Sequence, residues 1–308
     1  MNFMYLYLPV ALTSINVLIP VGLGLAVGLL SGLFGVGGGF LLTPLLIMFG
    51  IPATVAAATD SNQIVAASTS GTYAHWRVGN VDFKMGLYLL VGGFVGGLFG
   101  VQAIKILKAT GNADFVIKMT YVLMLGSVGS YMLFESLSSL RKNKVEKVED
   151  EKETGFTRFL KSLPLQTHFE KSGVTHSLLL PVIFGGFVGV LAAIMGVGGG
   201  FLMVPVMVYI LRMPMHVVVG TSLFQILFNC IEVTFLQAYT NHSVDFILAV
   251  LLLLGSTVGA QVGAVFGRKL KGEQLKVFLA AIVLMVTVKI VFDLTLTPSL
   301  LISQAGGH

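Results

Sequence analysis

The chain has 308 residues, of which 55% are hydrophobic and only 11% are charged, and its mean hydropathy is +0.91. A soluble domain carries roughly 25% charged residues, so this composition excludes an ordinary soluble protein and indicates a membrane protein. The formal net charge of +5 calls for no nucleic-acid partner, because basic residues that flank membrane spans are the usual orientation signal.

The segment Met1–Ile15 has neither a basic n-region nor a clear small-residue cleavage site, so we expect a retained segment rather than a signal peptide. Later apolar runs approach or reach the roughly 20 residues that cross a bilayer as a helix. In chain order these runs are Gly86–Leu98 with its flanks, Phe115–Phe134, Leu178–Met195, Phe246–Phe266 and Val277–Phe292. They predict an all-α polytopic membrane protein with the lipid bilayer as its main surroundings.

Internal repetition organises the chain. The stretch GVGGGF occurs at Gly35–Phe40 and again at Gly196–Phe201, and the tripeptide VDF occurs at Val81–Phe83 and again at Val244–Phe246. Glycines at four-residue spacing follow each VDF, at Gly92, Gly96 and Gly100 and at Gly255, Gly259 and Gly263. We expect residues 1–140 and 176–308 to form two membrane repeats. Residues 141–175 would form a charged cytoplasmic linker, in which GFTRFLKSL predicts a short helix on the membrane surface.

The distribution of Lys and Arg favours inverted repeats. With five membrane elements in each repeat and a cytoplasmic linker, more basic residues fall inside than outside, as the positive-inside rule requires. The inside set is Arg77, Lys84, Arg212, Arg268, Lys269, Lys271 and Lys276, and the outside set is Lys105, Lys108, Lys118 and Lys289. With four spans in each repeat, more basic residues would fall outside than inside. Both termini are then expected outside.

Many secondary transporters consist of inverted repeats that contain broken helices. The segment after the first GVGGGF, Phe40–Phe49, is too short to cross a bilayer at about 1.5 Å per residue, so we expect a half-helix there and in the second repeat. The N-terminus of such a half-helix offers free N–H groups to an anion, and glycines allow close approach. The alternative is that the motif glycines only permit tight helix packing, which is our interpretation of the two glycine ladders.

Polar segments follow both half-helices. Their hydroxyl and amide groups could hold an oxyanion, or could only join helices. The candidates are Thr59, Ser61, Asn62, Gln63, Thr221, Ser222 and Gln225. Asp60 and Glu232 are carboxyl groups within these apolar surroundings and are candidates for coupling transport to a proton or sodium ion, or for a structural role. His75, near the end of its segment, is a candidate gate or pH sensor.

The doubled GVGGGF, the stretches TDSNQ and TSLFQ, and the pair GNVDF and HSVDF resemble the TauE/SafE family of sulfite exporter-like permeases, also called the 4-toluene sulfonate uptake permease family. The resemblance implies a cofactor-free carrier of sulfite or small organosulfonate anions in a prokaryotic cytoplasmic membrane. It places the substrate site on the polar residues named above and on the motif glycines Gly35, Gly37, Gly38, Gly39, Gly196, Gly198, Gly199 and Gly200.

The expected function is therefore secondary transport of a small anion by alternating access, coupled to an ion gradient. A passive anion channel, a membrane sensor or scaffold, and a carrier of a different small anion remain alternatives. The motifs HExxH, CxxC and GxSxG are missing from the sequence, and the single Cys230 has no evident histidine partner, so we expect neither an enzyme nor a metal site.

Overall fold

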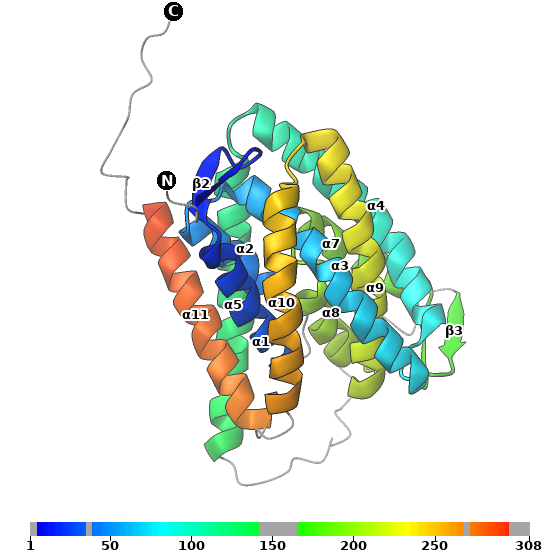
Figure 1. Ribbon diagram of the computed structural model, residues 1–308. Coiled ribbons are helices and arrows are strands. Elements are labelled where there is room, and N and C mark those ends of the chain that lie inside the picture. Colours follow the sequence, from blue (N-terminus) through cyan, green and yellow to red (C-terminus); the bar gives the residue numbers. More distant parts are fainter. Residues whose placement is uncertain (1–4, 35–38, 142–164, 268–271, 296–308) are drawn as a thin grey trace, which may run out of the picture.

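The computed structural model of the protein describes residues 5–34, 39–141, 165–267 and 272–295. The regular secondary structure of these residues is helical apart from two short β-hairpins (Figure 1), as predicted for an all-α membrane protein. Among them, three helical segments are long and apolar enough to span a membrane: Phe83–Ala109, Met215–Asn241 and Phe246–Gly263. The surface helix predicted within the linker lies outside the described residues.

Within the described residues, each repeat opens with a hairpin and continues with five membrane elements; in the second repeat, two of these elements are an α-helix continued directly by a short π-helix. The first repeat contains β1 (Tyr5–Leu8), β2 (Thr13–Asn16), α1 (Leu18–Phe34), α2 (Gly39–Met48), α3 (Ala53–Arg77), α4 (Phe83–Ala109) and α5 (Ala113–Arg141). The second contains β3 (Gln166–Phe169), β4 (Val174–Ser177), α7 (Leu179–Met195), α8 (Gly200–Pro205), η1 (Val206–Ile210), α9 (Met215–Leu236), η2 (Gln237–Asn241), α10 (Phe246–Gly267) and α11 (Gly272–Thr295).

The two hairpins are antiparallel and occupy equivalent places, with Leu8 opposite Thr13 in the first and Phe169 opposite Val174 in the second. Leu8 and Phe169 are both fully buried and anchor their hairpins to the helices. The second hairpin spans residues 166–177, across the boundary expected between the linker and the second repeat. Neither hairpin was predicted from the sequence.

The equivalent helices α3 and α9 run antiparallel. A Cβ placed on Gly71, near the end of α3, would lie 2.8 Å from the side chain of Leu223, near the start of α9. At the opposite ends of these helices, the hydroxyl of Thr59 meets the residue that precedes α10. Since equivalent helices point in opposite directions, the two repeats are inverted, as the distribution of basic residues predicted.

The first helix of each repeat packs on the fourth helix of the other. A Cβ on Gly92, Gly96 or Gly100 of α4 would lie 2.8 Å or less from a carbonyl oxygen of α7. A Cβ on Gly255, Gly259 or Gly263 of α10 would lie 2.1 Å from a carbonyl oxygen of α1. The prediction that these glycine ladders serve helix packing is confirmed, since only residues without a side chain permit these distances.

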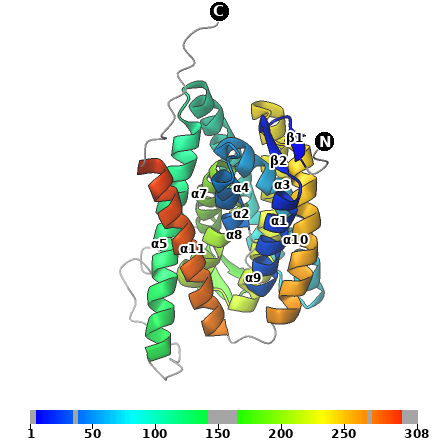
Figure 2. The same cartoon turned by 60° about the vertical axis from the view of Figure 1, so that its left-hand side comes forward.

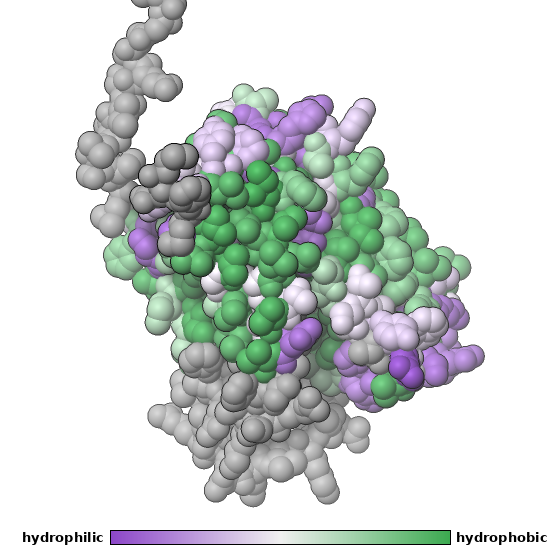
Figure 3. All heavy atoms as spheres, viewed as in Figure 1, coloured by the Kyte–Doolittle hydropathy of each residue, from purple (hydrophilic) through white to green (hydrophobic). Residues whose placement is uncertain are grey.

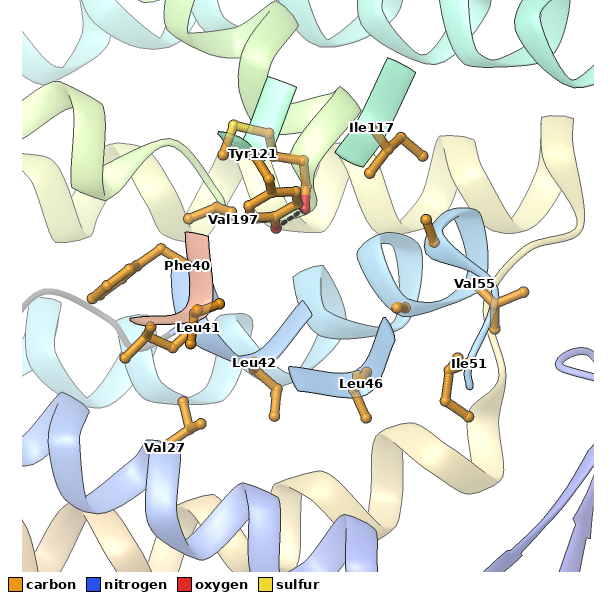
Figure 4. Packing of buried hydrophobic residues seen from close by; sticks show 14 of the residues in the cluster. Val27, Phe40, Leu41, Leu42, Leu46, Ile51, Val55, Ile117, Tyr121 and Val197 are labelled. Carbon is orange, nitrogen blue, oxygen red and sulfur yellow. Dashed lines mark hydrogen bonds between the residues drawn. The ribbon is translucent and has the colours of Figure 1, made fainter. Parts of the chain in front are cut away.

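The half-helix of each repeat lies inside the protein. Residues Phe40–Leu42 and Leu46 of α2 are buried in one apolar cluster with residues of α1, α5, α10 and α11. Figure 4 shows Val27 on one side of α2 and Tyr121 with Ile117 on the other. A second cluster surrounds α8 and η1, between α4, α7 and α9. The prediction of a half-helix after each glycine motif is confirmed.

The outside of the bundle carries many exposed apolar side chains, among them Phe99, Phe134, Phe235 and Phe246. On the face seen in Figure 3, hydrophobic residues cover the middle and hydrophilic residues gather near the top and at the lower right. Figure 2 shows α5 and α11 side by side at one flank of the bundle. This distribution suits a protein that is surrounded by lipid.

Candidate functional site

The second glycine motif forms a sharp backbone turn between α7 and α8. Gly196 ends α7 at φ 73°, Gly198 follows at φ 69°, and Gly199 precedes α8 at φ 81°. A Cβ on Gly196 would lie 1.9 Å from the carbonyl oxygen of Ala57, and one on Gly198 would lie 2.5 Å from the sulfur of Cys230. Positive φ and missing space both require glycine here, so the turn has a structural reason independent of any ligand.

The starts of the two half-helices meet in the core. Gly39 and Gly200 are the first residues of α2 and α8, and both are buried. The rings of the next residues, Phe40 and Phe201, stack with their centroids 4.7 Å apart. The remaining predicted glycines of the first motif, Gly35, Gly37 and Gly38, lie outside the described residues.

Thr59 and Thr221, both predicted to bind the substrate, make equivalent contacts across the repeats. The hydroxyl of Thr59 accepts a hydrogen bond from the backbone N–H of Asp245 at 3.1 Å. The hydroxyl of Thr221 accepts one from the backbone N–H of Asp82 at 3.0 Å. These two hydroxyls therefore join helices of opposite repeats, which is the alternative role that the sequence left open.

The aspartates of the two VDF tripeptides connect three segments each. One oxygen of Asp82 caps α4 at the backbone N–H of Met85, and the other accepts hydrogen bonds from the N–H and hydroxyl of Ser172 in the second hairpin. Asp245 likewise caps α10 and accepts from Val10 and Ala11 in the first hairpin. In the sequence, VDF served as a sign of repetition and as part of the family resemblance, and this capping role was not predicted. An aspartate just before an apolar helix is a known N-cap signal that could have revealed this role.

The two predicted serines bond to backbone carbonyl groups. The hydroxyl of Ser61 lies 3.1 Å from the carbonyl oxygen of Gly196 and so attaches α3 to the second glycine motif. The hydroxyl of Ser222 donates to Val219 within its own helix, at 3.0 Å. Asn62 is partly exposed on α3. The structure thus brings Ser61 into contact with a motif glycine.

Asp60 is fully buried beside the start of α2. Its Oδ2 accepts a hydrogen bond from the hydroxyl of Thr43 at 2.8 Å. Its Oδ1 lies 3.4 Å from where a Cβ on Gly39 would sit, and it has no hydrogen-bond partner among the residues that the structure describes. Nearby, the hydroxyl of Tyr121 donates to the carbonyl oxygen of Met195 (Figure 4). A carboxyl group at this position faces the positive end of the half-helix.

Buried amide groups without partners gather on α3 and α9. Gln63 Oε1 and both side-chain polar atoms of Gln225 make no hydrogen bond to any described residue. The same holds for both polar atoms of Asn229 and for Glu232 Oε2, at the positions four and seven residues after Gln225. Sequence reasoning missed Asn229, although its place one helical turn beyond Gln225 was a usable signal.

Such groups are unusual inside a protein, where most buried polar atoms are hydrogen-bonded. They are equipped to bind water or a ligand in the membrane interior, with amide donors and acceptors at Gln225 and Asn229 and acceptor oxygens at Gln63, Asp60 and Glu232. His75 Nδ1 is also buried and lacks a partner within the described ranges. No group of three or more His, Cys, Asp or Glu residues suited to a metal ion occurs in the described part of the chain.

Comparison with known proteins gives a consistent assignment. The family model described as sulfite exporter TauE/SafE matches residues 21–290. The chain is 29% identical over 272 residues to the probable membrane transporter protein YjnA of Bacillus subtilis, covering 87% of this chain and 97% of that protein. It is 24% identical over 283 residues to the probable membrane transporter protein YunE of the same organism, covering 89% and 97%.

A plant protein shares a shorter region. Sulfite exporter TauE/SafE family protein 2 of Arabidopsis thaliana is 31% identical over 107 residues, which cover 34% of this chain and 23% of that protein. No solved structure matches the chain significantly. Since the family model spans nearly all of both repeats, the chain is a multi-pass membrane protein that belongs to the sulfite exporter TauE/SafE family of membrane transporters.

Proposed function

We propose that this protein is a secondary transporter that moves sulfite or a small organosulfonate anion across the membrane by alternating access, coupled to an ion gradient. The observation that carries the proposal is the meeting of two half-helix starts, at Phe40 and Phe201, between inverted repeats. Free N–H groups at helix starts bind anions, and inverted-repeat carriers hold their substrates between such half-helices.

The surroundings of the half-helices support a sulfur oxyanion. Gln225 offers a buried amide NH₂ group without a partner among the described residues, and a sulfonate or sulfite group has three oxygens that accept hydrogen bonds. The predicted site residues contain no arginine, so binding would be reversible, as a carrier needs. Within this proposal Asp60 and Glu232 carry the coupling. The names of the plant relatives point to the same substrate class.

The test is sulfite flux into proteoliposomes that contain the purified protein, with taurine, sulfoacetate, thiosulfate, sulfate and phosphate as competitors. We expect saturable flux that sulfur anions compete for and that an imposed ion gradient drives uphill. Non-saturable flux that only follows the electrochemical gradient of the anion itself would favour the channel alternative. Flux that phosphate blocks better than sulfonates would reject the substrate class and keep the anion carrier.

A further inference from the structure

Two polar side chains of α9 and two glycines of α4 form a site between these helices. On α9, Asn229 and Glu232 face α4, where Gly93 and Gly97 lie opposite them. A Cβ on Gly93 would lie 2.5 Å from Asn229 Oδ1, and a Cβ on Gly97 would lie 2.8 Å from Glu232 Oε2. The two glycines therefore make the space that both side-chain ends occupy. Figure 1 shows α4 and α9 side by side.

The atoms in this site lack ordinary partners. Neither amide atom of Asn229, which is 1% exposed, makes a hydrogen bond to a residue that the structure describes. Glu232 Oε2 is buried and equally without a partner in the described ranges. An amide and a carboxyl oxygen that are buried without partners in a membrane protein are costly, so this arrangement calls for a bound species.

The chemistry of the site selects that species. A carboxylate repels anions, so the substrate is excluded, whereas carboxylate and amide oxygens are ligands for hard cations. A single carboxylate balances one positive charge, which fits a monovalent ion better than Ca²⁺ or Mg²⁺. A proton would occupy only Glu232 and would leave Asn229 Oδ1 without a partner, whereas a sodium ion could take this oxygen and a carboxylate oxygen as ligands. We infer that Asn229 and Glu232 bind a sodium ion between α4 and α9.

This inference rests on the proposed function, for which the site would supply the coupling ion. Gln225 lies one helical turn before Asn229 on the same face of α9 and is also a candidate anion ligand. A sodium ion at Asn229 would thus lie within about two turns of the anion, close enough to attract it through the membrane interior. The two ligands would then favour each other's binding.

The experiment measures the melting temperature of the full-length protein in detergent, with NaCl, KCl or choline chloride at constant ionic strength. A ligand that binds only the folded state raises the melting temperature with its concentration. We expect Na⁺ to stabilise the wild type, and Glu232→Gln to weaken the apparent Na⁺ affinity by about tenfold or more. The matched control is Asp293→Asn, an exposed carboxyl group on α11, which should keep the Na⁺ response.

Two further variants protect the test against a folding defect in Glu232→Gln. The atoms nearest a Cβ on Gly97 belong to the carboxyl end of Glu232, and those nearest a Cβ on Gly93 belong to the amide of Asn229, so Gly97→Ala and Gly93→Ala each displace one proposed ligand. Glu232 ends in a flexible chain that can shift, so Gly97→Ala should fold. Loss of the Na⁺ response in both supports the site. An unchanged response in Glu232→Gln and Gly97→Ala, equal stabilisation by K⁺, or a response to pH alone overturns it. Sulfite flux that persists equally without Na⁺ overturns sodium as coupling ion while leaving the anion carrier intact.

Discussion

The backbone N–H of Asp245 donates to the hydroxyl of Thr59 across 3.1 Å, and this contact joins the start of α10 in the second repeat to α3 in the first. The equivalent contact joins Asp82 to Thr221 at 3.0 Å. Both aspartates also hold the hairpin of the opposite repeat. The two contacts therefore hold the inverted repeats together at opposite ends of the α3 and α9 pair.

Removing either aspartate should destabilise the fold. Asp245→Ala would leave the buried N–H of Leu248 and the part-buried N–H of Val10 without this acceptor, at a cost of roughly 1–3 kcal/mol. Thermal unfolding in detergent measures this loss. Asp114→Ala removes an exposed acceptor and should change stability far less. Equal melting temperatures for Asp245→Ala and Asp114→Ala would contradict the role of Asp245.

The glycine ladder gives a second stability prediction. In Gly255→Ala the new Cβ would lie 2.1 Å from the carbonyl oxygen of Val21, so α1 and α10 must separate, at a cost of about 1–3 kcal/mol or more. Gly22→Ala is the control on the partner helix, since no atom lies within 4 Å of its Cβ position. We expect a lower melting temperature and yield only for Gly255→Ala. Comparable losses in both variants would refute the packing explanation.

Gln225→Leu tests the anion site. The substitution preserves much of the side-chain volume and removes a buried amide without partners among the described residues, so it should leave stability unchanged or raised. If this amide binds the substrate, sulfite affinity should fall by roughly tenfold, the effect of about 1.4 kcal/mol. Saturable flux and sulfite-dependent melting both report it.

The control for Gln225→Leu is Gln237→Leu. Gln237 donates to the carbonyl oxygen of Ala193 at 3.2 Å and accepts from Asn241 at 2.6 Å. This variant should lose stability and keep its sulfite affinity. The opposite pattern in the two variants would move Gln225 from the substrate site to a packing role.

Asp60→Asn should abolish the coupling of anion movement to an ion gradient without abolishing the movement itself. An ionised Asp60 and a bound anion would compete for the positive end of α2, so the charge of this side chain links the anion to a second ion. The asparagine keeps an oxygen for the hydroxyl of Thr43 and removes the charge. We expect exchange of labelled sulfite to continue and gradient-driven accumulation to disappear. Accumulation at the wild-type level would exclude Asp60 from coupling.

The sequence was sufficient to predict the repeats, their inversion and both half-helices, because glycine motifs and basic residues are local signals. The hairpins were missed because strands of four residues, such as Tyr5–Leu8, are too short for a clear alternation. The partners of Thr59 and Thr221 were also missed, since hydrogen bonds between residues 186 and 139 positions apart leave no local pattern. The roles predicted for the polar residues at the site stay predictions.

The packing of the first helix of each repeat on the fourth helix of the other repeat has a consequence for biosynthesis. The glycine-bearing face of α10 is the partner of α1, yet α10 is made only after nearly all the preceding helices have left the ribosome. Until α10 has been synthesised, α1 lies in the bilayer without the helix on which it packs in the folded protein. Likewise α4 can pack on α7 only after the linker and α7 have been synthesised. The packing between first and fourth helices is therefore completed late in synthesis. A single repeat made alone could bury these helix faces only against a second molecule.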